Sequence, residues 1–246
     1  VYRSLDGTNY SLVNTTAADA TSFNDTGLIP GTTYFYRVAA VTEGAISSFL
    51  SGAQATNAAG EDTCAGAGGN WSSTATWTDG SVPTNSDNVT IGSGCTVTVD
   101  AMVSAFNVTI DSGGTLQSPL TGASIFGLSV GGNLMNNGTL DLSTNGNTSG
   151  ALLSFVAPMP NVSFGGTGAI TDVRAIVIDK GAQANTVELS PSNFTVQDVN
   201  TDATGFLSIT SGTFKISGNF TAANRVFLAA GYSIPALGGF WLNNPN

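Results

Sequence analysis

The sequence predicts an all-β protein, and three observations point to that fold class. Short runs rich in Val, Ile, Thr and Phe recur along the chain, and Gly, Asn, Asp and Ser bound them. Apolar and polar residues alternate in 96–99, 107–110 and 214–217, as in a strand with one buried face. No window long enough for a helix carries an apolar stripe of helical period, so we expect almost no helix.

The composition restricts the partners that this chain can have. It has 246 residues, enough for one large or two small domains, with 6 Lys+Arg, 16 Asp+Glu, no His and a net charge of −10. Nucleic acids and anionic membranes both attract basic residues, so we expect neither as a partner. No apolar run is long enough to insert across a bilayer. The acidity itself is most simply a means of solubility.

Two cysteines, Cys64 and Cys95, lie in a region rich in Gly, Ser and Thr. A zinc site is implausible with so few thiols and no His. We predict a disulfide that closes the intervening loop, which implies an oxidising, extracellular compartment. The alternative is a pair of buried free thiols.

The first segment, residues 1–57, carries a turn followed by an aromatic strand. Leu28-Ile29-Pro30-Gly31-Thr32 precedes the run 34–41, which reads Tyr-Phe-Tyr-Arg-Val-Ala-Ala-Val. This pattern resembles the second half of a fibronectin type III module, and the resemblance implies a partial β-sandwich in which Tyr34 makes a tyrosine corner. The strands that the family places earlier are missing here. Either a neighbouring chain supplies them or the sequence is a fragment of a longer polypeptide, as its start at Val1 also suggests.

Residues 58–69 hold four glycines and read as a linker. The segment after it contains Asn70-Trp71-Ser72, a second Trp at position 77, Val82-Pro83-Thr84 and Asp87-Asn88-Val89-Thr90-Ile91. It resembles the entry of a parallel β-helix in large secreted bacterial surface proteins. The resemblance implies a right-handed parallel β-helix, or solenoid, over residues 70–246.

The spacing of the strand-like runs supports a solenoid. Runs begin near 88, 106, 126, 160, 175, 194 and 206–214, so we predict one rung for every 15–20 residues. The longest gap has room for an extra strand at 138–142. Gly-Gly pairs at 113–114, 131–132 and 165–166 suit tight corners.

The last residues, 238–246, read Gly-Gly-Phe-Trp-Leu-Asn-Asn-Pro-Asn and stop within the pattern of a further rung. A solenoid needs a polar terminal cap, and none is visible, so we expect the solenoid to continue in a longer parent polypeptide or to be completed by self-association. A fibronectin-like module, a β-helix and this ending together resemble giant surface proteins of Bacteroidetes.

Few residues qualify as site residues. Trp71 and Trp77 are predicted to cap the first coil and, together with Tyr232, are candidates for stacking on a glycan. Asp198, Asn200 and Asp202 have the spacing of a calcium loop but lack its later glycine and glutamate, so an ordinary turn is the alternative. Thr63, in Asp62-Thr63-Cys64, resembles the acceptor of Bacteroidetes O-glycosylation. Calcium is the one cofactor that we consider.

Catalysis is not expected. The chain has no His, no Gly-x-Ser-x-Gly elbow, and acidic residues that are spaced singly along it. Polysaccharide lyases share the β-helix but need basic residues near the sugar carboxylate, and residues 38–173 contain no Lys or Arg. We therefore predict a non-catalytic structural segment, a stalk or filament subunit, at the cell surface. The alternatives are a carbohydrate-binding adhesin module and, after it, a lyase-like enzyme.

Overall fold

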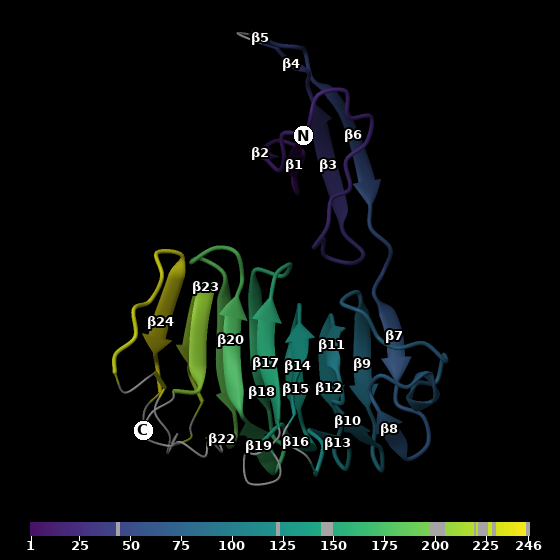
Figure 1. The fold of residues 1–246 in the computed structure, drawn as a ribbon, viewed down its shortest axis with the longest axis vertical. Coiled ribbons are helices and arrows are strands. Elements are labelled where there is room, and N and C mark those ends of the chain that lie inside the picture. Colours follow the sequence, from purple (N-terminus) through teal and green to yellow (C-terminus); the bar gives the residue numbers. More distant parts are fainter. Residues whose placement is uncertain are drawn as a thin grey trace. The chain divides into compact units, whose positions relative to one another are not determined.

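The chain folds into two units in the computed structural model, which describes residues 1–42, 45–121, 124–143, 150–196, 205–218, 220, 226–227 and 230–244. We call Val1–Ala59 the N-terminal unit and Gly60–Asn246 the solenoid unit (Figure 1). The predicted all-β class is confirmed, because η1 (Thr74–Thr76), a 3-10 turn, is the one helical element among these residues. No helix in the described ranges is long and apolar enough to cross a membrane.

In the N-terminal unit four strands form one antiparallel sheet in the order β2-β1-β3-β6. They are β1 (Tyr2–Ser4), β2 (Ser11–Leu12), β3 (Thr33–Val38) and β6 (Leu50–Ala55). The described residues add only a short hairpin of β4 (Val41–Thr42) and β5 (Ala45–Ile46). This hairpin is far smaller than the second layer that a sandwich requires, so the fibronectin-like sandwich is not confirmed.

The best-buried aromatic residue of the N-terminal unit is Tyr34, on β3. The preceding turn has Gly31 at a φ of 64°, a left-handed conformation that glycine adopts without strain. The Tyr34 hydroxyl then accepts a hydrogen bond from the backbone N–H of Ile29 at 2.9 Å. A tyrosine corner makes this same bond to the chain a few residues upstream, so the role predicted for Tyr34 agrees with the structure.

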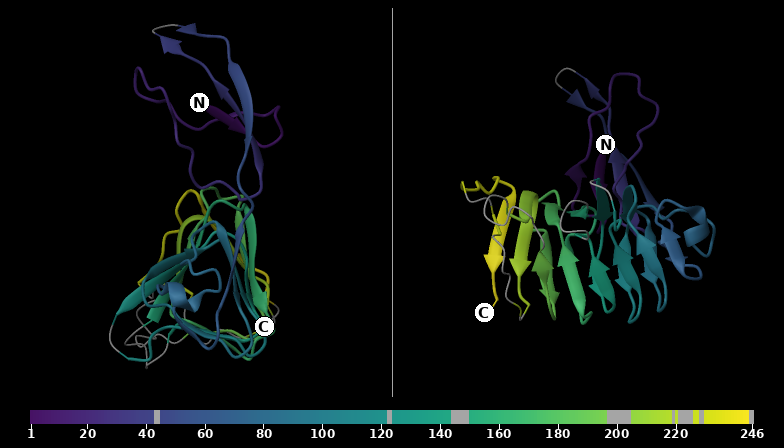
Figure 2. Two further views of the ribbon diagram at one scale, coloured as in Figure 1. Left: turned by 90° about the vertical axis from the view of Figure 1, so that its right-hand side faces the viewer. Right: turned by 60° about the horizontal axis from the view of Figure 1, so that its bottom comes forward.

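The solenoid unit is a parallel β-solenoid of about six turns, and its strands form three faces around one core (Figure 2). Face A consists of β7 (Gly60–Thr63), β9 (Asp87–Ile91), β12 (Asn107–Ile110), β15 (Leu134–Asn136), β18 (Asn161–Gly166), β21 (Thr186–Pro191), the second half of β23 (Leu207–Ile216) and β24 (Gly238–Leu242). Face B consists of β8 (Gly68–Asn70), β10 (Thr96–Thr98), β13 (Thr115–Gln117), β16 (Thr139–Asp141), β19 (Ile170–Val173) and β22 (Thr195–Val196). Face C consists of β11 (Met102–Ala105), β14 (Ile125–Val130), β17 (Gly150–Val156), β20 (Ala175–Asp179) and the first half of β23.

The alternation read from the sequence places apolar residues inward on each face. On face A the in-register residues of successive turns form what we call the core column, and each is at most 3% exposed: Val89, Val108, Leu134, Phe164, Leu189 and Ile216. Burying one such side chain contributes roughly 1.5–3 kcal/mol. Each turn therefore adds to a continuous core, which is what stabilises a stack of repeats.

The predicted rung length is too short for most turns. One turn is 19 residues from Asn88 to Asn107, as expected, but it is 30 residues from Asn133 to Ser163. The turns from β9 to β23 contain three strands each, so the runs near 106 and 126 are β12 and β14 of a single turn. The extra strand predicted at 138–142 is present as β16.

The glycine pairs lie at corners, as predicted. Gly113, at a φ of 85°, turns the chain between β12 and β13, and the pair 131–132 joins β14 to β15. Gly166 ends β18 at a φ of 120°, where a side chain would collide with the backbone of Asn136. The segment 58–69, which the sequence suggested as linker, contains β7 and the first two residues of β8.

Candidate functional site

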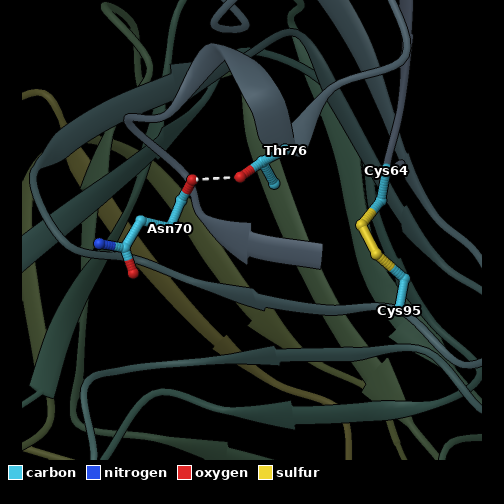
Figure 3. The surroundings of a disulfide bond; sticks show 4 residues. All are labelled: Cys64, Asn70, Thr76 and Cys95. Atoms are coloured by element: carbon cyan, nitrogen blue, oxygen red, sulfur yellow. Dashed lines mark hydrogen bonds between the residues drawn. A yellow bond between two sulfur atoms is a disulfide. The ribbon is translucent and has the colours of Figure 1, made fainter. Parts of the chain in front are cut away.

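The predicted disulfide, Cys64–Cys95, is present and lies at the start of the solenoid unit, across its first two turns (Figure 3). Cys64 follows β7 and Cys95 precedes β10, and their Cα atoms are 6.4 Å apart. The Thr76 hydroxyl donates to the carbonyl oxygen of Asn70 at 2.7 Å and holds η1 against β8. Both cysteines lie at the corner between face A and face B, so the disulfide joins the first turn to the second.

Trp71 and Trp77 lie inside this turn rather than on its surface. Their rings meet edge to face at 5.1 Å, and the side chains are 0% and 2% exposed. The Trp77 indole N–H donates to the carbonyl oxygen of Trp71 at 2.9 Å. This burial fits the capping prediction and is against the glycan-stacking one, because neither ring offers a face to a sugar.

Tyr232 has few surfaces left for a ligand. Its ring stacks on Phe227 at 4.7 Å. Its hydroxyl donates to the carbonyl oxygen of Ile209 at 2.9 Å and accepts from the N–H of the same residue at 2.6 Å. One ring face and the polar group thus stabilise the last turns, which weakens the case for a glycan contact here.

Two other predicted sites have different outcomes. Asp198, Asn200 and Asp202 lie outside the described residues, so the candidate calcium loop stays a prediction. Thr63 is exposed on β7, next to the buried residues Asp62 and Cys64. Its hydroxyl is accessible, and its O-glycosylation also stays a prediction.

The sequence did not reveal a polar column that crosses face A. The Asn107 amide donates to the side-chain oxygen of Asn88 at 2.7 Å, and the Asn88 amide donates to Glu61 at 2.6 Å. The Asn107 side-chain oxygen accepts from the N–H of Asn133 at 2.7 Å. Glu61 and these three asparagines are in register on successive turns, and we call them the amide column. The only advance signal was an Asn within one residue of the start of three strands.

Beside the amide column lies a row of hydroxyls. Thr63, Thr90 and Thr109 are in register, and Met135 takes the next position in the row. The amide column, together with Thr90, Thr109 and Met135 of the neighbouring row, lines a shallow depression of about 370 Å³. Neither Thr90 nor Thr109 donates its hydroxyl to any described residue, so both are available to hydrogen-bond a ligand.

Among the described residues of the solenoid unit, three carboxyl groups have raised pKa values. Burial raises the pKa of Asp141 and of Asp172, which lie in register on β16 and β19. The Asp172 carboxylate accepts hydrogen bonds from Ser143 at 2.7 Å and from Thr195 at 2.9 Å, so protein groups already satisfy it. Burial also raises the pKa of Asp62 to about 6. The described residues include no group of three or more Cys, Asp or Glu side chains close enough to hold a metal ion.

The last strand of face A differs from all others on that face. Leu242 continues the core column, in register with Ile216, yet it is 63% exposed. Trp241 is 53% exposed, and the Lys215 ammonium lies 4.6 Å from the centroid of its ring. β24 thus leaves exposed a core-column side chain, Leu242, whereas the core-column residues of the earlier turns are buried.

No protein-family model matches this chain, and no curated protein or solved structure is significantly similar to it. The solenoid fold rests on the strand pairing described above. The resemblances to fibronectin type III modules and to Bacteroidetes surface proteins gain no support from a related protein.

Proposed function

We propose that the solenoid unit is a non-catalytic structural segment, a stalk or filament subunit, of an extracellular cell-surface protein. The observation that supports this role most directly is the continuous core of the solenoid, which makes successive turns mutually stabilising. The disulfide fits an oxidising compartment outside the cytoplasm. The placement among surface proteins of Bacteroidetes is part of the same proposal.

In this proposal, the first turn of a second copy, or a further turn of a longer parent polypeptide, covers β24. Leu242 supports it, because this core-column residue is exposed where its six predecessors are covered. β24 also has one edge that pairs with no described strand, and an extended strand can add to such an edge. A head-to-tail contact of this kind repeats without closing and gives a filament.

The test is sedimentation velocity and negative-stain electron microscopy of the full chain over a range of concentrations. We expect concentration-dependent association into regular filaments, and Leu242→Lys should weaken it at least about tenfold by placing a charge at the contact. The matched control is Leu120→Lys, because Leu120 is 61% exposed but lies away from β24. A wild-type chain that stays monomeric, or equal effects of both variants, would contradict end-to-end assembly.

A second function, carbohydrate binding, is favoured by the depression on face A. Its amide column and hydroxyl row offer hydrogen-bonding groups at the strand spacing of about 4.8 Å. These groups are largely uncharged, which suits a neutral, extended polysaccharide. Affinity electrophoresis with neutral polysaccharides tests the idea. Thr109→Val should reduce retention, whereas Thr115→Val, the same change on face B, should not; equal retention of both variants and wild type would exclude this site.

A further inference from the structure

A buried carboxyl group lies in the first turn of the solenoid unit. Asp62, on β7, is 4% exposed, between the exposed residues Glu61 and Thr63. Its Oδ1 atom is buried and has no hydrogen-bond donor among the described residues. An unpaired buried carboxylate is costly, so something has to neutralise it or coordinate it.

A second carboxyl group lies against the first. Asp79 follows Trp77 in a segment that runs antiparallel to the end of β7: Trp77 pairs with Cys64, and Asp79 therefore lies opposite Asp62. A side-chain hydrogen bond between the two carboxyl groups contributes to the shift of both pKa values. This segment is held in place because Thr78 donates its N–H to the carbonyl oxygen of Thr63 at 2.9 Å. Asp79 accepts the N–H of Ser81 at 2.9 Å, which fixes its carboxylate. The two acids therefore face each other on a firmly placed loop and strand.

The surroundings supply more negative charge and no positive charge. Glu61 is adjacent on β7, and Asp87 begins the neighbouring strand β9. Residues 38–173 contain no Lys or Arg, and the chain has no His. Within the solenoid unit, no basic side chain precedes Arg174 in the sequence. The negative charge of Asp62 is therefore neutralised by a proton or by a bound cation.

We propose that Asp62 and Asp79 bind one calcium ion in the first turn of the solenoid. Calcium prefers hard oxygen ligands and tolerates irregular geometry, so two carboxylates can be completed by backbone carbonyls and water. With only two carboxylate ligands, the affinity falls in the range of extracellular calcium modules, a dissociation constant of about 0.1–1 mM. The ion fastens the loop containing Asp79 to β7. This site does not depend on end-to-end assembly.

The binding test uses terbium, a luminescent stand-in for calcium, on the full chain. Trp77 lies two residues from Asp79, so excitation of tryptophan should sensitise terbium emission, and calcium should compete it away. Asp62→Asn and Asp79→Asn should each weaken binding at least about tenfold. Asp111→Asn is the control, because Asp111 is an exposed acid in the turn after β12.

The stability test compares melting temperatures with and without about 2 mM calcium, with magnesium at the same concentration as a control. Binding to the folded state alone should raise the Tm of wild type by about 3 °C, and neither variant should respond. Asp79 is exposed, so Asp79→Asn should fold even if Asp62→Asn does not. Wild type that does not respond to calcium, together with an Asp62→Asn variant more stable than wild type, would show that the pair holds only a proton. Terbium emission that survives both substitutions would place the ion elsewhere.

Discussion

The two units of this chain differ greatly in how many of their apolar side chains they bury. In the N-terminal unit only Tyr34 is a buried hydrophobic residue among those described, whereas the solenoid unit buries a long series of them. The N-terminal unit also leaves large apolar side chains exposed on a short stretch of chain: Leu5, Leu12, Val38, Val41, Ile46, Phe49 and Leu50.

The cause is closure of the sheet. A single four-stranded sheet can bury a face only against another layer, and the described residues of the N-terminal unit supply none of adequate size. In the solenoid unit, three faces surround one interior, and each turn covers the turns before and after it. A strand becomes stable when its inward side chains are enclosed, whatever its own propensity.

The largest expected effect is a cavity in the closed core. Phe155 is fully buried, and its ring lies 5.8 Å from that of Phe164. Phe155→Ala should lower the free energy of unfolding of the solenoid unit by about 3–5 kcal/mol. Leu50→Ala in the N-terminal unit should change stability by less than about 0.5 kcal/mol, because Leu50 is 78% exposed.

Urea unfolding followed by tryptophan fluorescence measures the first variant selectively, because all three Trp residues belong to the solenoid unit. Amide hydrogen exchange reports on the second. Similar losses of stability in Phe155→Ala and Leu50→Ala would contradict the contrast between the closed and the open sheet.

The next effect concerns the disulfide between the first and second turns. Replacing both Cys64 and Cys95 by Ala should cost about 3–4 kcal/mol, because the bond closes a loop whose ends are 31 residues apart. The measurement is the urea midpoint of the double variant beside wild type with and without reductant. Reduced wild type should behave like the variant, and a variant as stable as oxidised wild type would refute a stabilising role.

A smaller effect is expected at the tyrosine corner. Tyr34→Phe removes the acceptor of the Ile29 N–H and should destabilise the N-terminal unit by about 1 kcal/mol. Tyr10→Phe is the control, since the Tyr10 ring lies under Arg37 but its hydroxyl bonds to no described residue. Hydrogen exchange of the β3 amides distinguishes the two variants. Equal protection of the β3 amides from exchange in both variants would mean that the hydrogen bond of Tyr34 does not stabilise the N-terminal unit.

The smallest effect is a pH dependence at Lys180. This side chain is 1% exposed, and its ammonium donates to the carbonyl oxygens of Val156 at 2.5 Å and Gly131 at 3.3 Å. Burial lowers its pKa to about 8, so the folded state disfavours the charged form. Stability should therefore rise as the pH increases through 8, by at most about 1 kcal/mol between about pH 7.5 and pH 9.

Lys180→Met is the reference for this measurement because it cannot titrate. The difference in unfolding free energy between wild type and Lys180→Met should shift in favour of wild type over that pH range. Parallel pH profiles for the two proteins would show that Lys180 does not titrate there.

Much of the fold could be read in advance, whereas most of the candidate site could not. Alternation in 96–99 and 107–110 predicts strands because one side of each is inside, and these runs are β10 and β12. The glycine pair 113–114 predicts a corner because glycine adopts the backbone conformation of a tight turn without strain, and this property is local. Spacing alone does not say how many strands make one turn, so β12 and β14 were read as separate rungs.

Contacts between distant residues account for what the sequence reading missed. Asp62 and Asp79 are ordinary acids in the sequence, and they meet only because the loop after Trp77 folds back on β7. The amide column depends on the register of β7, β9 and β12, which no local pattern encodes. Trp71 and Trp77 fit both a cap and a sugar platform until their burial is known.

The sequence by itself therefore determined the β class, the low charge and the disulfide partners, because these follow from residue type and short-range periodicity. Only the tertiary structure decided that one sheet closes and the other stays open. It also decided which carboxyl groups meet and that Leu242, a core-column residue by register, is left exposed. The physical reason is that the register between successive turns decides which side chains are buried and which ones pair. Contacts between residues 19 to 30 positions apart set that register.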